Sequence, residues 1–251
     1  MRAIILAVDV GKGLKPQMDA SPKCLLELGG KTLLRRYLDA LAALHVADAV
    51  CVVGHLKEQV KAEAAHGPAG LRVRFIENDK LTRGNILSLW HARDEFDDDI
   101  LVMDSDLLFP REMLARLLAS ADQNTIAVDE RFQDTGKEQK VLCEDGWLVE
   151  VTKKVNGKAP VCGAAVGVLR LSAEAAEVLR GILEEFVNSG MDSLEYQDAF
   201  RELAVEVPIS IVQVGDLPWI DIDVQDDLAR ARDEILPRIE RLDRGEALPT
   251  P

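Results

Sequence analysis

The first 35 residues constrain this chain most, because an apolar run there leads into a loop of glycines and lysines. Residues 3–8 read AIILAV, the loop at 9–16 reads DVGKGLKP, and SPK follows at 21–23. Glycines let backbone N–H groups approach an anion closely, and lysines supply positive charge. A strand that ends in such a loop is typical of a site for a polyphosphate.

Charge limits the partners of the chain. The 251 residues are 47% hydrophobic, enough for a large core in one or two domains, and carry a formal net charge of −14. Nucleic acids and anionic membranes need a basic face, so neither is an expected partner. A nucleotide needs only a local basic pocket and a divalent metal ion, and the opening loop can supply the first.

The cysteines and the N-terminus suggest a compartment. Cys24, Cys51, Cys143 and Cys162 are widely spaced and form no CxxC pair. This pattern favours reduced cysteines over disulfides or a zinc site. The apolar start runs directly into Asp9 without a signal-peptide cleavage region, and no run approaches the length of a membrane span. We therefore expect a soluble, cytoplasmic protein.

Strand and helix patterns alternate along the chain, and this predicts an α/β fold. Expected strands are 3–8, 49–54, 71–75, 100–103, 125–128 and 209–214, and expected helices are 31–45, 56–65, 84–96, one opened by Pro110, 173–188, 193–204 and 224–243. Repeated strand–helix units predict a mostly parallel sheet covered on both faces. Residues 129–170 instead carry hairpin signals around Asp145-Gly146. We expect one domain over 1–251 with a β-rich insertion at about 129–170.

Two pairs of aspartates are candidate metal ligands. Asp104 and Asp106 follow a buried strand, and carboxylates at a strand end can point toward a hard cation and its phosphates. An Asp-x-Asp pair is equally common as a helix cap or a solvated turn. Asp221 and Asp223 fall on one side of an extended segment with apolar neighbours, so they would form an opposite carboxylate wall. Asp226 and Asp227 are better explained as first-turn acids of the last helix.

These motifs, in this order, resemble the nucleotidyltransferase family that activates phosphorylated sugars and alcohols. The segments that carry the resemblance are Leu6-Ala7, Gly11, Leu14-Lys15-Pro16, Pro22-Lys23 and Gly30-Lys31-Thr32-Leu33-Leu34. Three further stretches are similar to the phosphocholine and 2-aminoethylphosphonate cytidylyltransferase branch, with inositol-phosphate cytidylyltransferases beside it. They are Glu77-Asn78 to Leu89, Asp145-Gly146 to Lys153, and Trp219-Ile220-Asp221-Ile222-Asp223.

The resemblance implies a fold, a reaction and a set of site residues. The fold would be the Rossmann-like, GT-A-like three-layer arrangement, and the reaction would join CTP to a small phosphate or phosphonate acceptor with Mg²⁺. Lys23 would neutralise charge at the α-phosphate, and Lys153, with Lys154 as a fallback, would meet acceptor charge. The implied metal ligands are Asp104, Asp106, Asp221 and Asp223. The implied nucleotide contacts are Ala7, Val8, Gly11, Lys12, Gly13, Lys15, Gly84, Asn85 and Ser88.

The chain departs from the family pattern in two places. Asp9 stands where relatives carry a glycine, and Gly13 stands where they carry an arginine that grips the β- and γ-phosphates. Either Lys12 or Lys15 replaces that arginine, with Asp9 turned away or binding a metal, or triphosphate binding is weakened or lost. The second departure is at 163–164, where relatives often carry Gly-Glu and this chain has Gly-Ala.

The second departure bears on the acceptor. Glu195 and Asp198 could replace the missing acid in substrate binding, or could equally lie on a solvated helix face. Two other functions stay open, a sugar-1-phosphate transferase that uses UTP, GTP or dTTP, and a non-catalytic nucleotide-binding relative. The segment at 129–165 is a candidate lid or dimer arm, so a homodimer is one expectation. An aromatic cage is not expected, because only 4% of the residues are aromatic.

Overall fold

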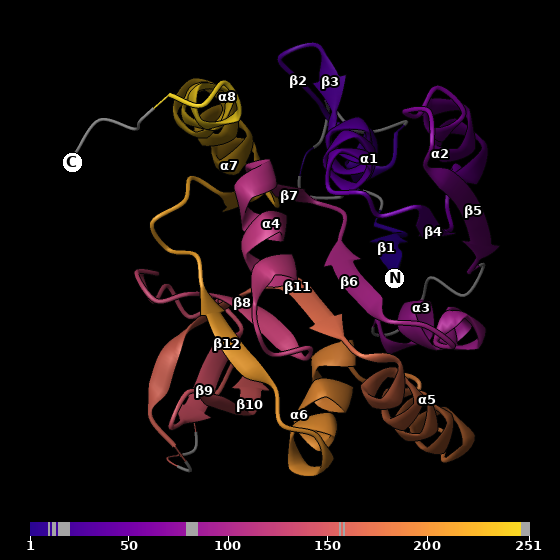
Figure 1. Cartoon of the computed structure of the whole chain (residues 1–251), viewed down its shortest axis with the longest axis vertical. Helices are drawn as coiled ribbons and strands as arrows, with labels where there is room; N and C mark the ends of the chain where they lie inside the picture. Colours follow the sequence, from indigo (N-terminus) through magenta and orange to yellow (C-terminus); the bar gives the residue numbers. More distant parts are fainter. Residues whose placement is uncertain are drawn as a thin grey trace.

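The computed structural model describes residues 1–9, 11, 14, 21–78, 85–155, 157 and 159–246, and every structural statement below concerns these residues. A nine-stranded sheet lies at the centre, with the strand order β5-β4-β1-β6-β11-β8-β12-β10-β9 (Figure 1). Its strands are β1 (Arg2–Ala7), β4 (Asp48–Val53), β5 (Arg72–Glu77), β6 (Ile100–Asp104), β8 (Thr125–Asp129), β9 (Lys140–Glu144), β10 (Trp147–Thr152), β11 (Val161–Leu171) and β12 (Ser210–Gln213).

Helices cover both faces of this sheet, as the alternating pattern predicts. They are α1 (Leu33–Ala43), α2 (Lys57–Ala64), α3 (Ile86–His91), α4 (Arg111–Ala119), α5 (Ala173–Asn188), α6 (Tyr196–Glu206), α7 (Gln225–Arg230) and α8 (Leu236–Asp243). Successive side chains of a strand point to opposite faces. Ile5 accordingly joins the core under α1, α2, α4 and α8, whereas Ile4 joins the core under α3, α5 and α6. The predicted three-layer α/β class is confirmed.

The sheet is mixed, because β11 runs against its neighbours. Strands β5, β4, β1 and β6 pair in parallel, and so do β8 and β12. Strand β11 is antiparallel to both β6 and β8, in the middle of the sheet. Strand β9 pairs with β10 and also with β11, so β11, β8, β12, β10 and β9 pair in a closed ring. The expected β-rich insertion is therefore built into the central layer.

Several boundaries differ from the sequence expectation for local reasons. The helix expected at 31–45 begins at Leu33, because the hydroxyl of Thr32 accepts the N–H of Arg35 at 3.0 Å and caps it. The helix expected at 84–96 is the shorter α3, followed by a 3-10 turn at Arg93–Glu95. The terminal helix is α7 and α8 joined by a π-helical turn at Ala231–Ile235.

The expectation of four reduced cysteines is wrong for two of them. Cys143 on β9 and Cys162 on β11 form a disulfide, with Cα atoms 6.0 Å apart. The antiparallel pairing of β9 with β11 brings these residues together, and no local sequence motif encodes that pairing. Cys24 and Cys51 are free and buried. No helix in the described part of the chain is long and apolar enough to cross a membrane.

Candidate active site

A small two-stranded sheet assembles the acidic residues. After β6 ends at Asp104, the chain turns and forms β7 (Leu107–Leu108), which pairs antiparallel with β13 (Ile220–Asp221). The N–H of Ile222 also donates to the carbonyl of Asp106 at 3.1 Å. The hydroxyl of Tyr37 accepts from Leu107 N–H at 2.8 Å and donates to the Leu107 carbonyl, which fixes the turn from below. The two aspartate pairs predicted to face each other thus lie side by side.

Lys23 lies at the centre of a cluster of carboxylates. Its side chain is 2% exposed, and its Nζ lies 2.9 Å from Asp106, 2.5 Å from Asp223 and 3.3 Å from Asp9. The N–H of Lys23 also donates to the carbonyl of Asp9 at 3.1 Å. Burial alone would lower the pKa of Lys23, but the three carboxylates raise it well above its ordinary value. Lys23 therefore carries a fixed positive charge.

The same carboxylates suit a divalent cation. One oxygen from each of Asp9, Asp106 and Asp223 lies within 4.8 Å of the others, and carboxylate oxygens are the ligands that Mg²⁺ prefers. Asp9 is therefore not turned away from the site. Its other contact is with Gly11, whose N–H donates to Asp9 Oδ1 at 3.1 Å and whose φ of 60° lies in the left-handed region.

Asp104 and Asp221 have raised pKa values. Burial and the charge of Asp106 raise the pKa of Asp104 to about 7. Loss of hydration and the charges of Asp106 and Asp223 raise the pKa of Asp221 to about 8. Burial also raises the pKa of Asp106, against the opposing effect of Lys23. Because the pKa values of these acids are raised even with Lys23 nearby, a bound cation would displace protons from them.

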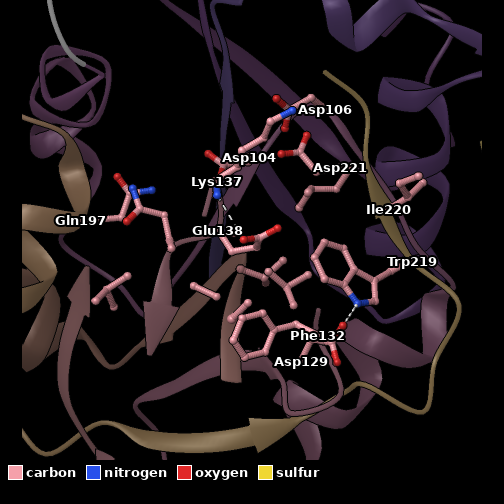
Figure 2. Close-up of a pocket in the computed structure, with 18 of the residues that line it drawn as sticks. Asp104, Asp106, Asp129, Phe132, Lys137, Glu138, Gln197, Trp219, Ile220 and Asp221 are labelled. Carbon is pink, nitrogen blue, oxygen red and sulfur yellow. Dashed lines mark hydrogen bonds between the residues drawn. The ribbon is translucent and has the colours of Figure 1, made fainter. Parts of the chain in front are cut away.

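A pocket of about 820 Å³ extends from the aspartates toward the ring of strands. Figure 2 shows Asp104, Asp106 and Asp221 at one end and Asp129, Phe132 and Trp219 at the other. The indole N–H of Trp219 donates to Asp129 Oδ2 at 3.1 Å, which fixes the ring. Four aromatic rings line the pocket, from Phe132, Tyr196, Phe200 and Trp219. Helix α6 supplies Tyr196 and Phe200, whereas Phe132 and Trp219 come from two other segments. The low aromatic content of the chain therefore did not predict that these rings meet.

The predicted acceptor residues divide between the pocket and the surface. Lys153 and Glu195 line the pocket. Asp198 is not one of the described residues that line the pocket. Its carboxylate instead accepts the N–H of Glu195 at 3.2 Å and pairs with Arg201 at 3.3 Å. Asp198 therefore caps the start of α6, and its role in substrate binding stays a prediction.

The predicted nucleotide residues are also divided. Asn85 lines the pocket, whereas Ser88 is 2% exposed and its hydroxyl accepts from Asn78 at 3.2 Å. The hydroxyl of Ser88 therefore faces the protein interior, against the expected nucleoside contact. Ala7 ends β1, and Val8 follows it beside Asp9. The other predicted nucleotide contacts lie outside the described residues, and they are Lys12, Gly13, Lys15 and Gly84.

Comparison with known proteins decides the family. A family model described as the MobA-like NTP transferase domain matches residues 3–239. The chain belongs to the MobA-like NTP transferase family. The predicted resemblance to nucleotidyltransferases is thereby confirmed, and the chain is a nucleotidyltransferase domain.

This transferase is similar to two curated relatives. It is 31% identical over 239 residues to the bifunctional IPC transferase and DIPP synthase of Rubrobacter xylanophilus, covering 93% of the chain and 52% of the relative. It is 33% identical over 128 residues to the CMP-5'-(3-aminopropyl)phosphonate synthase of Streptomyces rubellomurinus, covering 51% of the chain and 20% of the relative. The transferase thus spans about half or less of these two proteins.

Comparison with a solved structure also identifies the fold. The inositol-1-phosphate CTP transferase from T. maritima superposes with a TM-score of 0.80, at 20% identity and with 98% of each chain covered. At this identity the likeness shows a shared fold.

Proposed function

We propose that this transferase couples CTP to a small phosphorylated or phosphonylated alcohol, with Mg²⁺ and release of pyrophosphate. The observation that carries the proposal is the position of Lys23, held between Asp106, Asp223 and Asp9. Asp106 and Asp223 also line a pocket large enough for a small acceptor. Two of the relatives carry CMP or CTP in their names, one with an aminopropylphosphonate and one with inositol 1-phosphate.

The chain needs to supply positioning and charge neutralisation rather than a covalent intermediate. An oxygen of the acceptor phosphate or phosphonate attacks the α-phosphorus of CTP, and the bond from that phosphorus to the oxygen bridging to the β-phosphate breaks. The attacking oxygen is already anionic at neutral pH, so the reaction requires no general base. Charge accumulates on the α-phosphate in the transition state, and the ammonium of Lys23 is the group proposed to neutralise it.

The carboxylates are proposed to hold the metal ion. Asp106 and Asp223 would ligate it, since an oxygen of each lies within 4.8 Å of the other. Asp104 and Asp221 would complete the acidic set from the same end of the pocket. When bound, Mg²⁺ would neutralise phosphate charge and hold the phosphates in line for attack.

The acceptor would occupy the pocket, with Lys153 and Glu195 on its wall. Lys153 is the cation proposed to meet acceptor charge. Trp219 and Phe132 add apolar surface at the end of the pocket away from the Asp104, Asp106 and Asp221 group. A short acceptor with a compact head group, such as 2-aminoethylphosphonate or phosphocholine, suits a pocket that combines acids and rings.

A direct assay tests the proposal. Purified protein, Mg²⁺ and CTP are combined with a panel of phosphates and phosphonates, and pyrophosphate release and the CMP conjugate are measured. The expected result is conjugate formation that Asp106→Asn abolishes, while Asp39→Asn on the surface of α1 leaves it intact. Faster turnover of a sugar 1-phosphate with UTP, GTP or dTTP would favour the alternative transferase. CTP binding without turnover would support a non-catalytic relative, for which Asp9 and Gly13 are the sequence argument.

A further inference from the structure

Tyr196 connects two residues of the candidate site. It is the first residue of α6, its side chain is 3% exposed, and its hydroxyl donates to Asp104 Oδ2 at 2.5 Å. Its backbone N–H donates to the side-chain oxygen of Asn85 at 2.6 Å. Tyr196 therefore hydrogen-bonds both to Asn85, which precedes α3, and to Asp104, which ends β6.

The carboxylate of Asp104 is also confined by the backbone of β11. Gly167 has a φ of +87° at the register shift of β11 against β8. A Cβ atom at Gly167 would lie 2.5 Å from Asp104 Oδ2, which is closer than atoms can approach. The same carboxylate oxygen is thus packed against β11 and hydrogen-bonded by Tyr196. These two contacts restrict rotation of the Asp104 carboxylate, which lines the pocket.

A second bond joins the segments that Tyr196 links. The N–H of Ile86 donates to the carbonyl of Leu194 at 3.3 Å. The first turn of α3 and the start of α6 are therefore fixed to each other at two points. Any displacement of Asn85 would pass to the ring of Tyr196, and from there to Asp104.

We propose that Tyr196 is a positioning residue that holds Asp104 in the orientation the cation site requires and ties that orientation to Asn85. The inference rests on the proposed function in one respect, the divalent cation at the aspartates. A carboxylate near a metal ion is usually oriented by a hydrogen-bond partner of its own, and loss of such a partner typically lowers metal affinity or activity by about 10- to 100-fold.

The test measures cation binding without nucleotide. Mn²⁺ replaces Mg²⁺ because free Mn²⁺ gives an electron paramagnetic resonance signal that disappears on binding. Tyr196→Phe removes one hydroxyl and keeps the ring, and it is expected to weaken Mn²⁺ binding by about 10-fold. Asn85→Leu keeps the hydroxyl of Tyr196 but removes the side-chain oxygen that accepts the backbone N–H of Tyr196. We therefore expect a smaller loss of Mn²⁺ affinity than in Tyr196→Phe.

The control separates positioning from stability. Ser172 caps α5, with its hydroxyl accepting from Ala175 N–H at 3.2 Å. It follows Leu171, which pairs with Ile100 at the opposite end of β6 from Asp104. Ser172→Ala is expected to lower the melting temperature and leave Mn²⁺ affinity unchanged. In the transfer assay, Tyr196→Phe should raise the Mg²⁺ concentration needed for half-maximal rate, whereas Ser172→Ala should not.

Wild-type Mn²⁺ affinity in folded Tyr196→Phe would overturn the inference, and so would a wild-type protein that binds no Mn²⁺. An equal loss of affinity in Ser172→Ala would overturn it as well, because the effect would then follow stability alone. Absence of nucleotidyl transfer in the wild type, with the Mn²⁺ difference intact, would refute the proposed function and leave the role of Tyr196 standing.

Discussion

Replacement of Lys23 by methionine tests how much the charge of Lys23 stabilises the three carboxylates around it. Lys23 is the cation that Asp9, Asp106 and Asp223 share, at 3.3, 2.9 and 2.5 Å. Methionine keeps most of the side-chain volume and removes the charge. The three carboxylates would then repel one another without compensation.

The expected loss of stability follows from burial. Removal of one partner of a buried ion pair costs about 3–5 kcal/mol. The side chains of Asp223 and Asp9 are 64% and 50% exposed, so solvent screens part of the repulsion. We therefore expect a decrease of about 2–3 kcal/mol in the free energy of unfolding. In a protein of this size that corresponds to a decrease of roughly 5–10 °C in melting temperature.

Thermal melts with and without Mg²⁺ measure both consequences. Mg²⁺ should raise the melting temperature of Lys23→Met more than that of the wild type, because the ion replaces the missing charge. Lys31→Met is the matched control, since Lys31 makes a 2.6 Å ion pair with Asp39 on the surface with its side chain 53% exposed. Its stability should change by less than about 1 kcal/mol.

The transfer assay adds a kinetic criterion. Loss of one charge that stabilises the transition state should lower kcat by about 100-fold or more. Two results would refute the reasoning, a Lys23→Met protein that melts like the wild type, or one that gains less from Mg²⁺ than the wild type does. Unchanged kcat would remove Lys23 from its proposed catalytic role.

Three further predictions follow from the site and the fold. The folded-state pKa values of Asp104 and Asp221 lie near 7 and 8, above the ordinary 3.8, so the folded protein binds more protons than the unfolded chain. The stability of the metal-free protein should therefore fall as pH rises from about 4 to about 8. Mg²⁺ affinity should rise with pH through about 7–8. Thermal melts and Mg²⁺ titrations that do not change with pH would contradict these two expectations. Replacing Cys143 and Cys162 together by alanine should cost about 3 kcal/mol in urea unfolding, given their separation of 19 residues, and an unmoved midpoint would argue against the disulfide. Asp198→Ala should lose about 1 kcal/mol as a helix-cap variant and leave the KM for acceptor unchanged, whereas a raised KM would return Asp198 to the acceptor site.

The alternation of apolar strands and amphipathic helices predicted the layers well, because each strand of the parallel half has apolar residues on both faces. The position of β11 could not be predicted in this way. The sequence predicted only a β-rich insertion at about 129–170, and the partners of β11, which are β6 and β8, are selected by tertiary packing. The Cys143–Cys162 disulfide depends on the same non-local pairing. The start of α1 can be predicted from the sequence, because Thr32 before two leucines is a recognisable N-cap.

The site was predicted in part for a similar reason. Asp104, Asp106, Asp221 and Asp223 stood out because each pair adjoins an apolar run, and the structure brings all four to one pocket. The residue type does not tell in which direction a polar side chain on a helix points. Ser88 was therefore predicted to contact the nucleoside and Asp198 the acceptor, although both hydrogen-bond within the protein. For Asp198, the three-residue spacing after Glu195 is a capping signal that could have corrected the assignment.

The pairing of β7 with β13 also determines when the protein can acquire a complete site. Lys23 and Asp223 are 200 residues apart in sequence and meet only after the β13 segment has docked beside β7. Closing so long a loop costs entropy that no local contact offsets, so this step belongs among the slow ones of folding. A growing chain on the ribosome would hold β1, β6 and the glycine and lysine loop long before it had its full set of carboxylates. Cation affinity would then appear only in chains that have been made past Asp223 and have paired β13 with β7.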